Sequence, residues 1–413
     1  MNNTREADWV LVAIRRHLDR RGVTYADLQV RQLSTVGLIL SKIYLAEWIV
    51  GSRQLQSVVC KLTEDEPFKT AFRVLMHFHN ENFFFAELLP CLLGPASVQN
   101  DVSLLFPLFH FAHRDDLQWL IAMEDLTALD YKNVHKTLDL RHTTLALQAL
   151  GRFHALSYVA KKTQPAQFHS LIGRLQYPRK EKSFNFTLEL LILNSLRHTI
   201  SLFREAHPGE YAKHSAQIEE IISDATEVYG RLYTGSEPLA LLCHGDFKSE
   251  NLLFSYDGEE NPSTVKLIDF QLLSYSSPAI DVFLLLFMST APEIWETFWD
   301  TLFSSYHEAL LETVSKYNKC SLESLQEELG AEAFKTEFRK YCHHGFYVSN
   351  FFQPLRNCEP ELNALIIKTL AEDEISQTKL NNLLVNMNNN YSAEMKHYAL
   401  TLLQQVLVFK CMP

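Results

Sequence analysis

The stretch that decides the fold covers residues 241–283 and reads LLCHGDFKSENLLFSYDGEENPSTVKLIDFQLLSYSSPAIDVF. Three polar residues in it are placed around short apolar runs. Asp246 follows the run LALLC, Asn251 lies five positions later, and Asp269 ends the run VKLI eighteen positions further on. Short strands at 252–254 and 265–268, joined by a turn at Asp257-Gly258, would form a hairpin. The hairpin would bring Asn251 and Asp269 to one edge.

Transfer of a phosphoryl group from a magnesium nucleotide needs this set of side chains. One carboxylate orients the acceptor hydroxyl, while an amide oxygen and a second carboxylate hold Mg²⁺, which prefers hard oxygen ligands. We therefore predict a catalytic set of Asp246, Lys248 and Asn251, in which Asp246 is the base and Lys248 neutralises charge on the γ-phosphate. Asn251 and Asp269 are the predicted magnesium ligands. Each short motif is common alone, so the prediction depends on the joint pattern.

The segment resembles the catalytic region of the aminoglycoside phosphotransferase and choline kinase class of protein-kinase-like folds. Within that class it is most similar to the ecdysteroid kinase-like family, also called the CHK kinase-like family. The residues that carry the likeness are HGD at 244–246, Asn251, IDFQ at 268–271 and Ser277-Pro278-Ala279-Ile280-Asp281. Gln271 stands where protein kinases have the glycine of Asp-Phe-Gly, and no Ala-Pro-Glu follows. Both departures favour a small-molecule kinase over a protein kinase.

Further segments extend the resemblance over about residues 30–350. It implies that Lys61 holds the α and β phosphates of ATP and that Glu81 pairs with Lys61, with Glu87 as a competing partner. Taken alone, Lys61 would instead be a strand-end lysine whose ammonium reaches water, and Glu81 a solvent-facing helix residue. The segments are Val58-Val59-Cys60-Lys61, Phe78-His79-Asn80-Glu81, Met123-Glu124-Asp125-Leu126 and LGRFHALS at 150–157.

The resemblance also implies a linker between two lobes at Glu124, Asp125 and Leu126, whose backbone would meet the adenine. The side chain of Glu124 is not expected to contribute. We interpret His154 and Asp281 as structural residues, and Asp281 would brace the catalytic loop through backbone N–H groups.

The predicted nucleotide loop is poor in glycine, as is the whole chain, which has 13 glycines in 413 residues. The resembled family usually has G-x-N-x-x-S here. Alignment on Ser41 puts Val36 at the glycine, so Gly37 lies one place late. Backbone N–H groups near Gly37 and the Ser41 hydroxyl would then cap a phosphate. The weakened loop supports an alternative, a catalytically inactive pseudokinase that binds a nucleotide or another ligand.

The patterns along the chain predict an α+β, bilobal, protein-kinase-like fold. Residues 1–125 would form a small N-terminal lobe with strands, and residues 126–413 a larger, mainly helical lobe with the catalytic loop and substrate pocket. The asparagine-rich stretch 381–390 reads as a loop before the last helix. Strands are predicted at 36–44, 56–62 and 119–123, and helices at 6–21, 68–92, 139–161, 187–206, 214–234 and through most of the chain after Pro278.

Composition excludes several classes of protein. With 47% hydrophobic and 21% charged residues, the chain is too apolar for a disordered protein and too charged for a bundle of membrane spans. A net charge of −11 argues against nucleic-acid binding. Seven scattered cysteines without a CxxC pair predict no disulfide framework and no zinc site. Together with the absence of an N-terminal signal pattern, they favour a reducing, cytoplasmic location.

We therefore predict an enzyme that moves the γ-phosphate of ATP, with Mg²⁺, to a hydroxyl of a small molecule. The resemblance implies ecdysteroids as acceptors, and other sterol-like or foreign compounds as further acceptors. A steroid acceptor would need an apolar pocket in the helical lobe, and the aromatic stretch 346–352 is one candidate wall, although core packing explains it equally well. No obligate protein partner is inferred.

Overall fold

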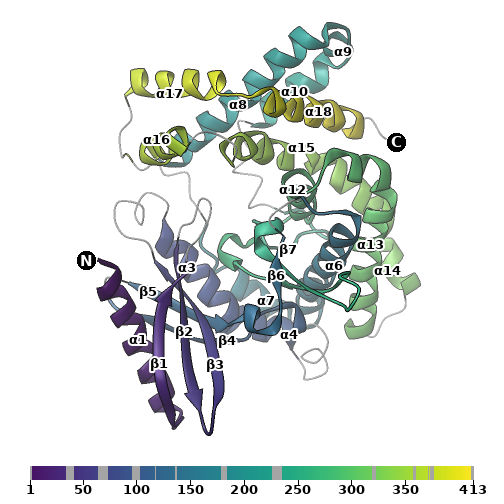
Figure 1. Ribbon diagram of the computed structural model, residues 1–413. Helices are drawn as coiled ribbons and strands as arrows, with labels where there is room; N and C mark the ends of the chain where they lie inside the picture. The colour runs from purple at the N-terminus through teal and green to yellow at the C-terminus, as the bar shows by residue number, and fades with distance from the viewer. Residues whose placement is uncertain are drawn as a thin grey trace.

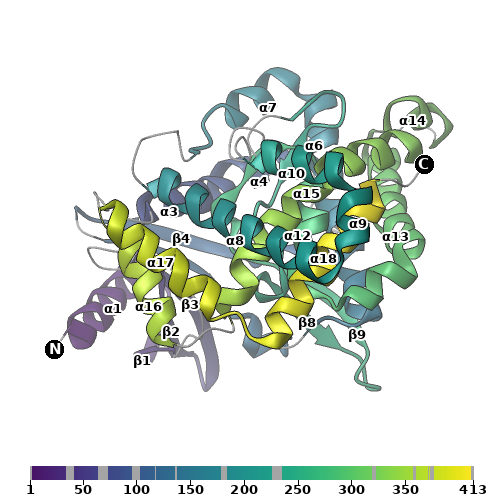
Figure 2. The ribbon, with the colours of Figure 1, turned by 90° about the horizontal axis from the view of Figure 1, so that it is seen from above.

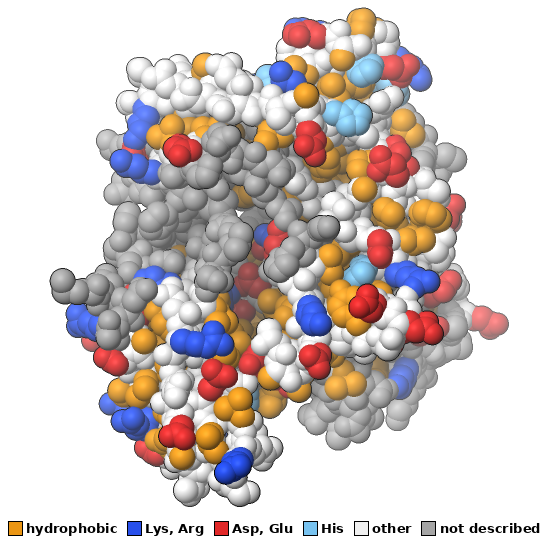
Figure 3. Space-filling view, in the orientation of Figure 1, with side chains coloured by type: hydrophobic (Ala, Val, Ile, Leu, Met, Phe, Trp, Pro, Cys, Tyr) orange, Lys and Arg blue, Asp and Glu red, His pale blue; other side chains and the backbone are white. Residues whose placement is uncertain are grey.

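The computed structural model has an antiparallel sheet in its N-terminal part and mostly helices in its C-terminal part, which confirms the predicted α+β class (Figure 1). Within the described ranges, none of the helices has the length and apolarity needed to span a membrane. Acidic and basic side chains intermingle over the described part of the face in Figure 3. The structure describes residues 2–33, 41–63, 73–94, 103–116, 118–134, 137–177, 184–225, 235–318, 322–356, 360–370, 372 and 376–410.

The N-terminal sheet has five strands in the order β1-β2-β3-β5-β4, and each neighbouring pair is antiparallel. The predicted strands at 36–44 and 56–62 correspond to β2 and β3, which form a hairpin that pairs from Val50 and Gln54 across a turn at 51–53. Gly51 adopts φ +61° in that turn, a conformation that favours glycine. The strands are β1 (Tyr25–Gln32), β2 (Ser41–Val50), β3 (Gln54–Thr63), β4 (Phe109–Arg114) and β5 (Trp119–Glu124).

Helix α1 (Asn2–Arg20) covers one face of this sheet (Figure 1). Its apolar side packs Val10, Ile14 and Leu18 against buried sheet residues that include Val58. A buried ion pair fixes the register, because the Glu6 carboxylate accepts from Lys42 Nζ and from the Tyr44 hydroxyl, each at 2.7 Å. Successive side chains of a strand alternate between faces. Lys61 therefore points away from α1, on the face opposite Val58, Cys60 and Leu62.

The predicted helical stretch 68–92 appears, where it is described, as three consecutive segments. Helix α3 (Val74–Phe83) runs into a turn of π-helix, η1 (Phe84–Leu88), and then α4 (Leu89–Leu93). Helix α3 contacts both the sheet, through β3 and β5, and the segment after β9. It therefore connects the sheet to the part of the chain that carries Asp269.

The C-terminal part contains two small sheets among its helices. The predicted hairpin around Asp257-Gly258 is β8 (Leu252–Tyr256) and β9 (Pro262–Leu267), joined by β6 (Lys132–Asn133) in a three-stranded sheet. Strand β7 (Leu241–Cys243) pairs with β10 (Ser274–Ser276). Short 3₁₀ turns connect these elements: η2 (Ser103–Leu105), η3 (Leu126–Leu129), η4 (Ser249–Asn251) and η5 (Phe270–Leu272).

Helix α12 lies at the centre of the helical part, and every residue in it is buried. Helices α8 to α10 and α16 to α18 form a layer at one end of the molecule (Figures 1 and 2). The helices are α6 (Leu140–Thr163), α7 (Pro165–Ile172), α8 (Phe184–Ala206), α9 (Pro208–Lys213), α10 (Ser215–Ala225), α12 (Ala279–Ser289), α13 (Pro292–Asn318), α14 (Leu322–Leu329), α15 (Ala331–Arg356), α16 (Pro360–Leu370), α17 (Gln377–Asn389) and α18 (Ala393–Lys410).

The prediction of a loop at 381–390 is wrong, because most of this stretch belongs to α17. Leu380, Leu383 and Met387 are buried at helical spacing, and the Ser376 hydroxyl caps the helix by accepting from Lys379 N. Burial of this apolar face outweighs the modest helix propensity of asparagine.

The strand predicted from 36 begins at Ser41 where it is described, and residues 36–40 lie outside the described ranges. The same is true of 226–234 in the predicted helix 214–234.

The tight crossing of α6 and α13 makes a prediction about Gly151. A Cβ added there would lie 2.3 Å from the carbonyl oxygen of Tyr306, so Gly151→Ala must push the two helices apart. We expect a loss of about 1–3 kcal/mol in the free energy of unfolding, measured by urea denaturation.

Gly173→Ala is the matched control for this variant. Its added Cβ would make only ordinary contacts, of 3.4 Å and longer, and its backbone is α-helical. We expect no loss of stability there. Equal stability of the two variants would contradict the close packing of α6 on α13.

Candidate active site

Three charged side chains from distant parts of the chain meet on the face of the sheet that α1 does not cover. Lys61 lies on β3, Glu81 on α3, and Asp269 directly after β9. Lys61 Nζ lies 2.6 Å from Glu81 Oε2 and also donates a hydrogen bond to Asp269 Oδ1. Lys61 is 6% exposed and Glu81 is fully buried. The expected pair of Lys61 and Glu81 is therefore formed.

The charges of these three residues depend on one another. Burial alone would lower the pKa of Lys61, but Asp269 and Glu81 outweigh burial and raise it. Burial raises the pKa of Glu81 to about 6, although Lys61 opposes the rise. Burial would also raise the pKa of Asp269, but the ammonium of Lys61 outweighs it and lowers this pKa. At neutral pH one ammonium group is therefore shared between two carboxylates.

The competing candidate, Glu87, has a different partner. It lies in the π-helical segment η1, and its Oε1 accepts from Arg174 Nη2 at 2.7 Å. Both side chains of this pair are about half exposed. Glu87 is therefore part of a surface ion pair, apart from the buried cluster of Lys61.

The loop after β7 carries the predicted catalytic residues. Lys248 Nζ lies 2.8 Å and 2.9 Å from the two carboxylate oxygens of Asp246. Asn251 Nδ2 donates to the backbone oxygen of Asp246 at 2.8 Å and to its Oδ2 at 3.1 Å. Burial raises the pKa of Asp246, Lys248 counters part of that rise, and the negative charge of Asp269 adds to it. The predicted residues Asp246, Lys248 and Asn251 thus form one hydrogen-bonded group.

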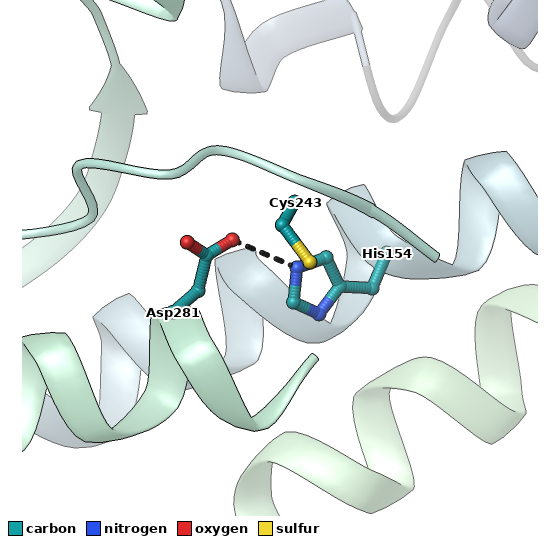
Figure 4. Close-up of side chains that lie close together, drawn as sticks. All are labelled: His154, Cys243 and Asp281. Carbon is teal, nitrogen blue, oxygen red and sulfur yellow. Dashed lines mark hydrogen bonds and ion pairs between the residues drawn. The ribbon is translucent and has the colours of Figure 1, made fainter. Parts of the chain in front are cut away.

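Asp281 holds this loop in the way expected from the sequence. Its Oδ2 accepts from the backbone N–H of His244 at 2.6 Å, and its Oδ1 accepts from that of Gly245 at 2.8 Å. On its other side, His154 Nε2 lies 3.1 Å from Asp281 Oδ2 (Figure 4), and His154 Nδ1 lies 2.9 Å from the Tyr306 hydroxyl. All three side chains are fully buried or nearly so. The backbone contacts expected of Asp281 are formed, and His154 contacts Asp281 from the side away from the loop.

The catalytic loop is also tied to the segment that carries Asp269. His244 Nε2 bonds to the backbone oxygen of Ile268 at 2.9 Å, and Ile268 N donates to the backbone oxygen of Asn251 at 3.1 Å. Phe270, the next residue after Asp269, stacks on Phe84 with ring centroids 4.0 Å apart. Asp269 itself has φ +69°, an uncommon backbone conformation for aspartate that these contacts hold in place.

The predicted linker residues lie at the end of β5. Glu124 is its last residue, Asp125 caps the turn η3, and Leu126 is buried at the start of that turn. The side chain of Glu124 has contacts that the sequence did not predict. Its Oε2 accepts from Leu108 N at 3.2 Å and from Lys266 Nζ at 3.3 Å, so it holds β5 to β9 and the segment before β4.

Two further predictions concern the nucleotide loop, with Gly37 and Ser41, and the aromatic stretch 346–352. Gly37 lies outside the described residues. Ser41 begins β2, is buried, and pairs with Thr63, two residues beyond Lys61. In the aromatic stretch 346–352, Phe346, Tyr347 and Phe351 are at most 1% exposed and belong to the main core, so core packing accounts for them.

The comparisons with known proteins agree with this geometry. A model of the ecdysteroid kinase-like family matches residues 40–319, which is more than half of the chain. The chain belongs to this family. No curated protein matches the sequence significantly.

Several solved structures also match this ecdysteroid kinase-like chain. One is the crystal structure of an aminoglycoside-3'-phosphotransferase of type VIII, at 14% sequence identity. The match covers 78% of this chain and 99% of that one, with a TM-score of 0.31. A score this low carries no further argument, and the family assignment depends on the family match.

In this family member, Gln271 and Asn80 form contacts that the sequence did not predict. Gln271 Nε2 donates to Asp269 Oδ2 at 3.0 Å, and its Oε1 lies 3.4 Å from Lys61 Nζ. Asn80 Nδ2 donates to the backbone oxygens of Gln271 at 3.3 Å and Gln176 at 2.8 Å. Gln271 thus helps to orient the Asp269 carboxylate. Gln271 and Asn80 belong to the motifs IDFQ and Phe78-His79-Asn80-Glu81, which gave no indication of these partners.

His154, Cys243 and Asp281 could be taken for a metal site of this kinase-like chain, since their ligand atoms all lie within 4.8 Å of one another (Figure 4). Each already has protein partners, however, and the Cys243 thiol donates to the backbone oxygen of Ser277 at 3.3 Å. Burial raises the pKa of Cys243 well above its usual value, which disfavours the thiolate that a metal needs. We interpret the group as a brace for the catalytic loop.

The shared ammonium makes a prediction about stability. Lys61→Met should lower the free energy of unfolding by about 3 kcal/mol, because it leaves the buried carboxylate of Glu81 beside the partly buried carboxylate of Asp269 without a counter-charge. Guanidinium denaturation at pH 7 measures this loss. Adding Glu81→Gln should restore part of it.

Lys162→Met is the matched control, because Lys162 pairs with Glu328 on the surface, where both side chains are about a third exposed. We expect a change below about 1 kcal/mol there. If both variants lost the same stability, the central role of Lys61 in the buried cluster would be refuted.

Proposed function

We propose that the chain is an ATP-dependent small-molecule kinase that transfers the γ-phosphate to a hydroxyl group of its acceptor. The observation that carries the proposal is the position of Lys61 between Glu81 and Asp269, with the group of Asp246, Lys248 and Asn251 held beside it. Membership of the ecdysteroid kinase-like family supports the same chemistry.

In this proposal Asp246 accepts a hydrogen bond from the acceptor hydroxyl and takes its proton as the phosphoryl group arrives. A carboxylate whose pKa is raised by burial is a better proton acceptor than an exposed one, which suits this role. Lys248 keeps the Asp246 carboxylate oriented and lies close enough to balance charge on the transferred group. Lys61 holds the α and β phosphates, and Glu81 keeps its ammonium in position.

The donor set at the site fits Mg²⁺. Asn251 uses its Nδ2 for both of its hydrogen bonds to Asp246, and within the described residues its Oδ1 accepts none. This amide oxygen and the Asp269 carboxylate are the hard oxygen ligands that Mg²⁺ prefers. When bound, the ion would neutralise charge on the phosphates. Gln271 and Lys61 would hold Asp269 in the orientation that binding requires.

For the nucleotide, we propose that the backbone of Glu124, Asp125 and Leu126 contacts the adenine, while Ser41 and the loop with Gly37 contact the phosphates. For the acceptor, we propose an ecdysteroid or another sterol-like or foreign compound with a free hydroxyl, as the family description suggests. We also propose a cytoplasmic location, which the buried free thiols Cys60, Cys91, Cys243 and Cys342 support.

The second candidate is a catalytically inactive protein on the same fold, which binds a nucleotide or another ligand without turnover. The observation that favours it is the displaced glycine of the sequence at 36–41. Two measurements separate the candidates: nucleotide binding, which both allow, and phosphate transfer, which only the enzyme performs.

For binding, we expect millimolar ATP with Mg²⁺ to raise the Tm, because a ligand that binds only the folded state stabilises it. Lys61→Ala and Asp269→Ala should abolish the shift, as they remove the proposed phosphate and metal contacts. Lys162→Ala, which changes an exposed lysine, should keep it. If ATP produced no shift in the wild-type chain, the proposed nucleotide site would be wrong.

For turnover, we expect Asp246→Asn to lose about 100-fold or more of its rate while keeping the ATP-dependent shift, because the amide cannot accept the proton. Release of ADP would be measured over a panel of ecdysteroids, other sterols, choline-like amines and aminoglycosides. Asp257→Asn, the same change in the exposed turn between β8 and β9, should keep full activity. Binding without turnover on any acceptor would support the inactive alternative.

A further inference from the structure

A second cavity lies on the far side of the N-terminal sheet from Lys61. It has a volume of about 300 Å³ and lies between α1 and strands β2, β3 and β4. This size is at the lower end of the range for small-molecule sites. Its walls are mostly apolar and include Ile14, Leu18, Trp48, Val58 and Phe111. Exposed residues, among them Arg21 and Gln54, also line it, so the cavity reaches the surface.

The cavity is separate from the proposed catalytic site. Val58 faces the cavity, whereas Lys61, three residues further along the same strand, points to the opposite face. The cavity therefore cannot share a ligand with the cluster of Lys61, Glu81 and Asp269. Neither the phosphate transfer proposed above nor the family match assigns it a role.

The open side of this cavity is positively charged. His17 of α1, Arg21 directly after α1 and His110 of β4 line it, and Arg20 is the last residue of α1. Within the described part of the chain none of these four forms an ion pair. Burial lowers the pKa of His17, and Arg21, His110 and Arg20 lower it further. Burial also lowers the pKa of His110. The positive charge of this side at neutral pH therefore comes from the two arginines, and an anion bound here would meet Arg21.

Trp48 adds an unused hydrogen-bond donor. The residue lines the cavity and is 8% exposed, and its buried Nε1 has no acceptor among the residues that the structure describes. The indole N–H can only donate, and leaving such a donor buried without a partner is unfavourable. The cavity thus combines apolar walls with an arginine that has no acidic partner among the described residues.

We propose that this cavity binds a small amphipathic carboxylate, of which a medium-chain fatty acid is the type. The chain of the ligand lies against Ile14, Leu18, Val58 and Phe111, and the carboxylate is met by Arg21. An apolar body with a single anionic end matches the division of the cavity into apolar walls and a cationic side. No bond is made or broken in this binding.

Decanoate below its micelle-forming concentration is the probe, and isothermal titration calorimetry at neutral pH is the measurement. We expect saturable binding of one decanoate per chain and binding of decanol weaker by about tenfold or more, because decanol lacks the charge that Arg21 meets. Decanol binding as tightly as decanoate would overturn the proposal, and so would the absence of decanoate binding.

Two variants locate the ligand by independent means. Arg21→Glu reverses the charge of an exposed residue and should weaken decanoate binding about tenfold or more. Gln56→Trp fills the cavity from a half-buried position and should abolish binding. Arg16→Glu makes the same charge reversal on α1 outside the cavity and should bind as the wild type does. Unchanged binding in both Arg21→Glu and Gln56→Trp would show that decanoate binds elsewhere and would refute the proposal.

Discussion

The ammonium group of Lys61 lies between the buried carboxylate of Glu81 and the partly buried carboxylate of Asp269, and the arrangement of the site depends on this balance of charge. Glu81 fixes Lys61 relative to α3, and Asp269 fixes it relative to the segment after β9. Asp246 and Lys248 add one further pair of opposite charges. The two ammonium groups and three carboxylates leave one net negative charge, so the site would repel a polyphosphate unless a cation entered with it. This charge balance is a physical reason for proposing magnesium.

A second set of contacts holds the loop after β7 and the segment with Asp269 in fixed positions. Asp281 binds two consecutive backbone N–H groups of the catalytic loop, and the ring of His244 bonds to the carbonyl before Asp269. Both the loop and the Asp269 segment are therefore positioned by groups that would not touch a substrate themselves. In a preorganised site of this kind, little free energy is lost in ordering the surroundings of the reacting groups.

The sequence was sufficient to predict contacts among residues that belong to short motifs. HGD, the asparagine five positions later and IDFQ predicted which side chains gather, and Phe78-His79-Asn80-Glu81 predicted the partner of Lys61. Strand β1 was missed because Asp27 has φ +52° and the register shifts between Ala26 and Gln29, so apolar and polar residues do not alternate. The contacts of Gln271 and Glu124 were missed because their partners are distant in sequence and become neighbours only in the folded chain.

Lys61 and Asp269 are 208 residues apart in the chain. Closing a loop of that length costs conformational entropy that no local contact returns, so this pair can form only after much of the intervening chain is ordered. Contact order is a mean over all contacts, so this one pair has little effect on the overall folding rate. During synthesis, Lys61 and Glu81 emerge well before Asp269. Until the segment after β9 has been made, Glu81 is the carboxylate of this group that can neutralise Lys61, and the site is completed late.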